Sequence, residues 1–388
     1  MNGASSRRTV RTALFLALCL ACCPLPAALA SRYVTQYEQS LRDFDKSYLD
    51  NKDLYAWNVS YYMRSLAIMY EATADEKYLE ILAEAIERVL AQRDDAVGDA
   101  DYLGRLRSAW GTARYSTDGS SHYVWAVHTG MITYPMIRFV RLVWADERLQ
   151  ARWGARALEY LRAVEDAVRT HDEDFVLGPD FEREGYYVFG AAAEHGIVSG
   201  DVLPLNQQNA LGLTLIELYA ATGNPEYLDK ASRLAHFFRN RLYRMPNGSY
   251  VWPYRADPTP LTGPVSIPAG PFAGSIARTG EDISHAAINA DFIIQAYKHG
   301  IVFQREDIDA LVRTVLENIF TPEGNVYSHI GGTGQLDDSY GLQVGRWLEL
   351  GLYDKRVFDV IAAYYDKRPA PIVVQAYLAW VDLHWEGR

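Results

Sequence analysis

The sequence predicts an all-α fold, an (α/α)6-type toroid of helical hairpins with long loops on one rim. Three observations support this prediction. Apolar residues recur at helical spacing in paired segments, the first segment of each pair is the more apolar, and short connections alternate with long ones. A helix surrounded by protein has no polar face, whereas an outer helix keeps one. We therefore expect the first helix of each hairpin in an inner ring and the second in an outer ring.

The hairpin repeat is clearest in two segments that share one phrase. LAIMYEATADEKYLE at 66–80 and LIELYAATGNPEYLD at 215–229 have the same order of apolar, turn and charged residues. In the second phrase, Gly223 ends one helix and Pro225 begins the next. The predicted pairs are 60–71 with 78–90, 127–143 with 149–169, 209–221 with 227–238, 286–298 with 307–320, 342–352 with 355–365, and 372–385 with 37–48. Strands are predicted only at 186–189 and 248–251.

Residues 1–30 have the features of a secretory signal peptide. Three arginines precede a short apolar run at 12–23, and the motif that ends at Ala30 has the small residues of a cleavage site. Cys22 gives the run a faint likeness to a lipoprotein signal, so a lipid anchor is the one membrane attachment that we expect. We expect 31–388 to be a single catalytic domain that is periplasmic or secreted.

The amino-acid composition indicates which kinds of ligand the protein is suited to bind. All three cysteines lie within residues 1–30, so the rest of the chain has neither disulfides nor thiol chemistry. The net charge of −11 argues against nucleic acid as a ligand. The 27 tyrosines and 9 tryptophans suit stacking on sugar rings, although a wide helical ring also uses aromatic residues to fill its core. The sequence gives no indication of an oligomeric state.

The long connections indicate which rim of the toroid carries the site. They run over 92–121, 171–204, 242–279 and 322–339, and each leads into an inner helix, so all four emerge on the same rim. Helix N-termini add partial positive charge there, which suits a carboxylate such as that of a uronate. The candidate substrate-binding residues at this rim are Arg114, His122, Trp125, His128, Arg278, Glu281, Asp282 and Asp338.

Several of these side chains have a structural explanation as well as a functional one. Asp282 is well placed to cap the helix that begins at the next residue. Capping does not require an imidazole, so His285 in the first turn is harder to explain by structure alone. The positive end of the helix dipole favours a neutral imidazole, which can act as a base or as a hydrogen-bond donor. His128 could equally be a satisfied core histidine.

The remaining candidates carry the same ambiguity. Tyr340 follows two carboxylates at a helix start, yet any one of so many tyrosines is core filler by default. Asn206 and Asn209 can cap a helix or can bind a carboxylate without adding charge. No metal, phosphate-loop or nucleophile motif is present, so no cofactor is expected. A structural calcium bound by Asp337 and Asp338 stays open.

Three segments resemble the α/α-toroid carbohydrate-active enzymes. They are NQQNALG at 206–212, TGNPEYLDKASRLAHFF at 222–238 and GEDISHAAINADFI at 280–293. The group includes polyuronate lyases, uronyl C5-epimerases and six-hairpin glycosidases such as the unsaturated-uronyl hydrolases. In the toroid lyases, an Asn, Arg or His neutralises the uronate carboxylate, and a Tyr, often with a His, transfers the protons.

The resemblance implies a polysaccharide lyase that acts by β-elimination on a uronate-containing glycan, alginate- or glucuronan-like. Carried over, it gives Asn206 or Asn209 as neutraliser, His285 as neutraliser or base, and Tyr340 as base and acid. Three alternatives remain. A glycoside hydrolase would pair Glu281 or Asp282 with Asp337 or Asp338 across the cleft. A C5-epimerase would use the lyase-like groups without bond cleavage, and a non-catalytic glycan-binding protein would use none of them.

Overall fold

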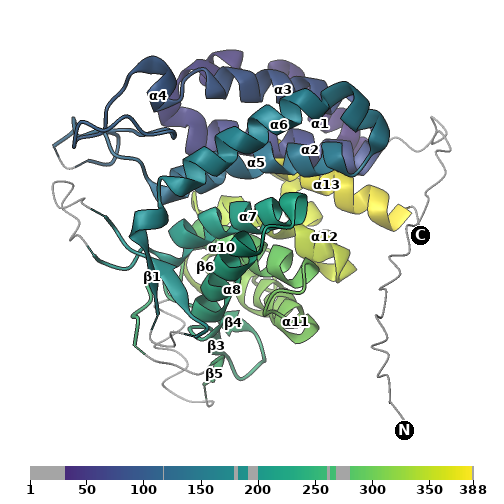
Figure 1. The fold of residues 1–388 in the computed structure, drawn as a ribbon. Helices are drawn as coiled ribbons and strands as arrows, with labels where there is room; N and C mark the ends of the chain where they lie inside the picture. The colour runs from purple at the N-terminus through teal and green to yellow at the C-terminus, as the bar shows by residue number, and fades with distance from the viewer. Residues whose placement is uncertain are drawn as a thin grey trace, which may run out of the picture. The chain divides into compact units, whose positions relative to one another are not determined.

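The computed structural model describes residues 31–386 except 117, 179–181, 191–199, 260–262 and 268–279. Residues Ser31–Arg388 cluster as one compact unit. Helices make up most of this unit, and the strands are short and lie in the connections (Figure 1). No helix among the described residues is both long enough and apolar enough to cross a lipid bilayer.

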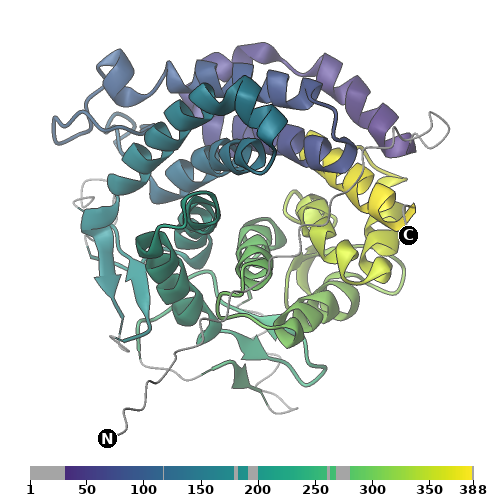
Figure 2. The same cartoon turned by 45° about the vertical axis from the view of Figure 1, so that its right-hand side comes forward.

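Within the described residues, six inner helices form a closed ring in which each contacts the next. They are α2 (Ser60–Thr73), α5 (Ala126–Trp144), α7 (Leu205–Thr222), α10 (Ile283–Lys298), the 3₁₀ helix η7 (Gly341–Leu352) and α13 (Ile372–Glu386). The last of these, α13, packs against both η7 and α2 and so closes the ring. Figure 2 shows these helices arranged around a common centre.

Each inner helix packs against an outer partner, which is the next helix along the chain in five cases and lies at the opposite end of the chain in the case of α13. These are α3 (Lys77–Leu90), α6 (Glu147–Arg169), α8 (Pro225–Arg239), α11 (Arg305–Arg313) with the π-helical turn η6 (Thr314–Ile319), α12 (Lys355–Tyr365) and α1 (Arg32–Asp43), which packs on α13. All six predicted hairpins are present, and the all-α toroid is confirmed. Shorter turns complete the helical part: η1 (Lys46–Asp50), η2 (Lys52–Leu54), η3 (Tyr55–Val59), α4 (Asp94–Val97) and η4 (Asp172–Asp174).

Burial differs between the two rings as the sequence predicts. Most residues of α7 are buried, whereas α8 buries a stripe and leaves charged residues at the surface. The inner helices α5 and α7 approach closely at Gly130, because a Cβ there would lie 2.3 Å from the carbonyl carbon of Ala210. Only glycine allows the two backbones to come so near.

The strands form small pairings in the long connections. They are β1 (Phe175–Leu177) with β2 (Gly185–Tyr187), β3 (Tyr243–Arg244) between β4 (Tyr250–Val251) and β5 (Val265–Ser266), and β6 (Tyr327–His329) with β7 (Thr333–Leu336). The sequence predicts only the regions of β2 and β4. The other strands have two to four residues each, too few for an alternating apolar pattern to stand out.

Two predicted helices differ in detail from the observed ones. The first helix was predicted at 37–48 but spans Arg32–Asp43, because Ser31 Oγ accepts the Tyr33 N–H and starts the helix earlier. The segment predicted as a helix at 342–352 is wound as a 3₁₀ helix. Gly345 packs there against α13, where a Cβ would lie 2.4 Å from Val374 Cγ1.

Candidate active site

A cavity of about 890 Å³ lies at the N-terminal ends of the inner helices. Its volume is within the range of about 300–1,000 Å³ that is usual for small-molecule sites. The inner helices and the turn before α2 contribute Trp57, Tyr61, Val127, His128, Gln207, Ser284, His285, Ile288, Gln343 and Arg346, and the long connections contribute Arg114, Tyr115, Trp125, Tyr254, Ser339 and Tyr340. The cavity therefore lies on the rim that the long connections predict.

Asp282 and His285 form a carboxylate–imidazole pair at the start of α10. Asp282 Oδ1 accepts the backbone N–H groups of Ser284 and His285, both at 3.0 Å, and so caps the helix. Its Oδ2 lies 2.5 Å from His285 Nδ1. Because a carboxylate only accepts, Nδ1 is the donor of this bond, and in the neutral imidazole Nε2 has the lone pair. One carboxylate thus serves both as helix cap and as the group that prepares His285 to act as a base.

Two tyrosines accompany His285 in the cavity. The ring centroids of His285 and Tyr340 are 6.3 Å apart, and those of His285 and Tyr254 are 5.4 Å apart. Tyr340 is 44% exposed, so its hydroxyl is accessible to a ligand. Asp338 does not line the cavity; its Oδ1 accepts the backbone N–H groups of Tyr340 and Gly341 and so fixes the turn that carries Tyr340.

His128 lies in an aromatic wall of the same cavity. Its ring packs edge-on against Trp57 and Tyr115, at centroid distances of 5.8 and 5.5 Å. Trp57 Nε1 donates to Tyr115 Oη at 2.7 Å, and Trp125 packs on Tyr115. Burial, with a smaller contribution from the cation of Arg114, lowers the pKa of His128 to about 3. This imidazole is therefore neutral near pH 7, and the wall around it suits stacking on a sugar ring.

Two guanidinium groups give the cavity positive charge. Arg346 is buried and donates to the backbone carbonyl and hydroxyl of Ser284, beside His285, and to Tyr61 Oη. Burial lowers the pKa of Arg346 to about 10, so it stays protonated at neutral pH. Arg114 forms no ion pair with a described residue, and its Nη1 donates to the backbone carbonyl of Asp53 at 3.1 Å. No carboxylate is among the described residues that line this cavity.

Asn206, Asn209 and Glu281 do not line the cavity, contrary to the sequence-based expectation. They are 1% exposed and lie among the inner helices. Asn209 Nδ2 donates to Asn289 Oδ1 at 2.7 Å, and Asn289 Nδ2 and Trp252 Nε1 each donate to Glu281 Oε2 at 2.6 Å. Burial raises the pKa of Glu281 well above its usual range, which favours the neutral form of its carboxyl group. The Asn209 side chain thus points from α7 toward α10, and Glu281, which precedes α10, is enclosed by Asn289 and Trp252.

Two further candidates lie elsewhere. His122 is outside the main cavity, with its Nε2 2.9 Å from Asp94 Oδ2, and it lines a second cavity. Arg278 lies outside the described residues. The structure thus brings together five of the predicted residues, namely Arg114, Trp125, His128, His285 and Tyr340, with Asp282 directly behind His285.

The two aspartates considered for calcium are engaged by the protein. Asp337 accepts from the backbone N–H of Val326, from Tyr364 Oη and from Arg368. Asp338 caps the turn at Tyr340. In the part of the chain that the structure describes, no group of three or more His, Cys, Asp or Glu residues is placed to hold a metal ion.

Sequence reasoning missed Trp57, Tyr61, Tyr115, Tyr254, Gln343 and Arg346, all of which line the cavity. Arg346 could have been found, because a charged residue in the apolar segment GLQVGRWLEL is unusual on an inner helix. Trp57 lies in the π-helical turn η3, where the regular spacing of apolar residues is lost. Tyr115 and Tyr254 stand alone in long loops, so no periodic spacing in the sequence distinguishes them from other loop residues.

We expect protonation of His128 and His171 to reduce the free energy of unfolding as the pH is lowered from about 6.5 to 3, against the opposite contribution of Asp174 and Asp291, whose pKa values burial raises to about 6. Burial lowers the pKa of both His128 and His171 to about 3, whereas an unfolded chain has histidine pKa values of about 6.5. At these two positions the unfolded state therefore binds more protons in this window, and each histidine contributes up to about 1.4 kcal/mol per pH unit to the slope.

Urea denaturation between pH 4 and 8 measures this slope. His171 Nε2 lies 2.8 Å from Thr129 Oγ1, so His171→Gln keeps a polar partner for the threonine and removes the titrating group. Below pH 6.5, the slope of the free energy of unfolding against pH should be smaller for the variant than for the unchanged protein. Above pH 6.5, the two curves should run parallel. A slope equal to that of the unchanged protein would contradict the assignment.

No protein-family model matches the chain, and no curated protein sequence matches it significantly. Solved structures do match. The GH76A α-1,6-mannanase of Salegentibacter sp. HEL1_6 has a TM-score of 0.50 and 12% sequence identity, over 85% of this chain and 88% of that one. An inactive variant of it with two aspartates replaced, in complex with α-1,6-mannotriose, has a TM-score of 0.52 and 11% identity over the same shares. At these identities the likeness concerns the fold, and this chain has the α/α-toroid fold of those carbohydrate-active enzymes.

Proposed function

We propose that this chain is a carbohydrate-active enzyme that removes a proton from a sugar carbon, and that it acts as a lyase on a uronate-containing glycan, alginate- or glucuronan-like. The observation that carries the proposal is the pairing of His285 with Asp282, beside Tyr340, in a cavity with two guanidinium groups. The signal-peptide features at 1–30 extend the proposal to a site of action in the periplasm or outside the cell.

The geometry suits the steps of β-elimination. A guanidinium group, Arg346 or Arg114, pairs with the uronate carboxylate and stabilises the enolate-like charge of the transition state. His285 Nε2 takes the proton from the carbon next to that carboxylate, and Asp282 stabilises the imidazolium that forms. The carbon–carbon double bond then forms as the bond to the leaving oxygen breaks, and the Tyr340 hydroxyl gives that oxygen a proton.

A glycoside hydrolase is less well supported by the same cavity. Such enzymes commonly use two carboxylates across the cleft, and the inactive mannanase variant lacks two aspartates. Here Asp337 and Asp338 are bound by the protein itself, and Glu281 is buried. The described lining of the cavity offers histidine, tyrosine and arginine, which are groups for proton transfer and carboxylate binding.

A uronyl epimerase is the second candidate, and His128 favours it. Inversion at a carbon is served by one group that removes the proton and another that returns a proton from the opposite face. The cavity holds a second imidazole, and burial keeps His128 neutral near pH 7. An epimerase would use the neutral His128 as the group that accepts the proton and the His285 imidazolium, stabilised by Asp282, as the group that returns one, and it would leave the glycosidic bond intact.

Incubation with a panel of polyuronates tests the proposal. Lyase action is expected to raise the ultraviolet absorbance, because the product contains a double bond conjugated with the carboxylate. Parallel reactions in D₂O report an epimerase by deuterium incorporation without a rise in absorbance. The His285→Ala protein is the control for contaminating activity. Release of reducing ends from a glycan with neither absorbance nor deuterium incorporation would contradict the proposal and indicate a hydrolase.

A further inference from the structure

A second cavity of about 530 Å³ borders the candidate active site. It is formed by the turn around η2, the end of α3 and the connection that leads to α5, and its lining includes Lys52, Asp53, Gln92, Asp99 and His122. Arg114 lines both cavities. We infer that the second cavity is a glycan subsite, which binds a further sugar residue of the chain that occupies the candidate active site. This inference rests on the proposed carbohydrate activity of the first cavity.

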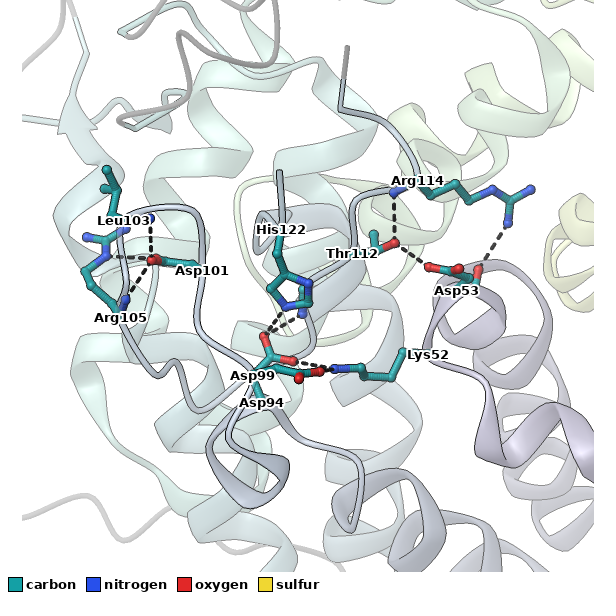
Figure 3. A network of polar contacts seen from close by, with 11 residues as sticks. Lys52, Asp53, Asp94, Asp99, Asp101, Leu103, Arg105, Thr112, Arg114 and His122 are labelled. Carbon is teal, nitrogen blue, oxygen red and sulfur yellow. Dashed lines mark hydrogen bonds and ion pairs between the residues drawn. The ribbon is translucent and has the colours of Figure 1, made fainter. Parts of the chain in front are cut away.

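The border between the two cavities is held in place by hydrogen bonds. The Arg114 N–H donates to Thr112 Oγ1 at 3.0 Å, and Thr112 Oγ1 bonds in turn to the carboxylate of Asp53. Arg114 Nη1 donates to the Asp53 carbonyl at 3.1 Å. Figure 3 shows these three residues as one group. The guanidinium is therefore anchored to the backbone but has no ion-pair partner among the described residues, so it can bind a carboxylate of a glycan at the junction.

A buried carboxylate fixes the floor of the second cavity. Asp94 is fully buried, and it bonds to His122 Nε2 at 2.9 Å, to the Gly111 N–H at 2.9 Å and to Lys52 Nζ at 3.1 Å. Lys52 also pairs with Asp99 (Figure 3). Because Asp94 is fully satisfied, it holds Lys52 and His122 in one arrangement. A fixed polar floor is a feature of a binding site, since little ordering is left for the ligand to impose.

Several groups at this cavity keep hydrogen-bonding capacity that matches the hydroxyls of a sugar. Asp53 binds Thr112 and Asp99 pairs with Lys52 through one oxygen each, so their other carboxylate oxygens can accept from a ligand, and the side-chain amide of Gln92 both donates and accepts. With the bond from His122 Nε2 to Asp94 in place, Nδ1 is the ring nitrogen left for a ligand. A ring whose hydroxyls meet the acidic side and whose carboxylate meets Arg114 fits both the charges and the polarity of this lining.

The dependence of binding on glycan length tests the subsite. Alginate and glucuronan fragments of two and five residues are titrated calorimetrically into the protein that carries His285→Ala, which prevents turnover. We expect the better-bound glycan to bind at least tenfold more tightly as a pentasaccharide than as a disaccharide. Adding Gln92→Trp, which fills the second cavity, should remove this gain and leave disaccharide affinity unchanged. Gln92→Ala, which removes one of several polar groups and leaves the cavity open, should reduce this gain less than Gln92→Trp does.

Ala91→Trp is the matched control, because Ala91 is the exposed neighbour of Gln92 and does not line the cavity. It should bind both lengths as the parent protein does, and circular dichroism checks that all variants are folded. Equal affinity for the two lengths, or a full gain that survives Gln92→Trp, would overturn the subsite while the proposed activity stands. Absence of binding by any fragment, together with no activity on any polyuronate, would overturn both.

Discussion

Replacing His285 with alanine is expected to lower kcat on the polyuronate substrate by about 100- to 10,000-fold, which is the usual contribution of a positioned general base. The imidazole is held by Asp282 at 2.5 Å, and nothing in the described structure suggests that folding depends on the ring. Steady-state kinetics followed by ultraviolet absorbance measure the loss, and circular dichroism confirms that helicity is kept.

Two further variants separate catalysis from structure. His299→Ala changes a histidine at the opposite end of α10 and should leave kcat within about twofold of the unchanged enzyme. Asp282→Asn keeps a good helix cap but removes the charge that supports His285, so kcat should fall while thermal stability stays nearly constant. A His285→Ala protein as active as the unchanged enzyme would remove His285 from the mechanism.

Replacing Asp291 with alanine is expected to destabilise the protein by about 3–5 kcal/mol, because it leaves the buried charge of Arg64 without its partner. Arg64 and Asp291 lie on facing inner helices, are 4% and 3% exposed, and are joined by a 2.7 Å contact between Nη1 and Oδ2. The Tyr377 hydroxyl also contacts Arg64. Urea denaturation at pH 7 measures the change in the free energy of unfolding.

An exposed pair on the outer ring provides the comparison. Arg305 and Asp309 form an ion pair at 2.9 Å with side chains 53% and 41% exposed, and Asp309→Ala should cost at most about 1 kcal/mol. The double variant Arg64→Met, Asp291→Leu replaces both buried charges by apolar groups and should recover most of the loss. If Asp291→Ala cost no more than Asp309→Ala, the buried pair would not stabilise the toroid.

The fold could be predicted because each hairpin shows the same features in its own stretch of sequence. Helical spacing of apolar residues, the polar face of the outer helices and the alternation of short and long connections are all local features of the sequence. They fix the hairpins and the rim that carries the long loops. They do not fix whether a helix has α or 3₁₀ geometry, as in η7, where Gly345 packs closely against a neighbouring helix.

The site could be predicted only in part, for a related reason. The first turn of an inner helix lies at the rim, so His128 and His285 were identifiable by position. Which side of that turn faces the cavity depends on how the helix is rotated within the closed ring. Asn209 therefore lies behind the lining although the sequence places it at the rim, and so does Glu281 just before α10. Trp57 belongs to the lining, and the sequence analysis does not single it out.

The contact between α13 and α2 has a consequence for how the chain folds during its synthesis. About 300 residues separate these helices, so their pairing is among the least local contacts in the molecule. As the chain emerges N-terminus first, the early hairpins can assemble into an open arc whose leading edge, α2, has an apolar flank without a neighbour. That flank is covered only when the final helix, α13, packs against it. A nascent or truncated chain therefore exposes an apolar surface that favours aggregation until α13 has been synthesised.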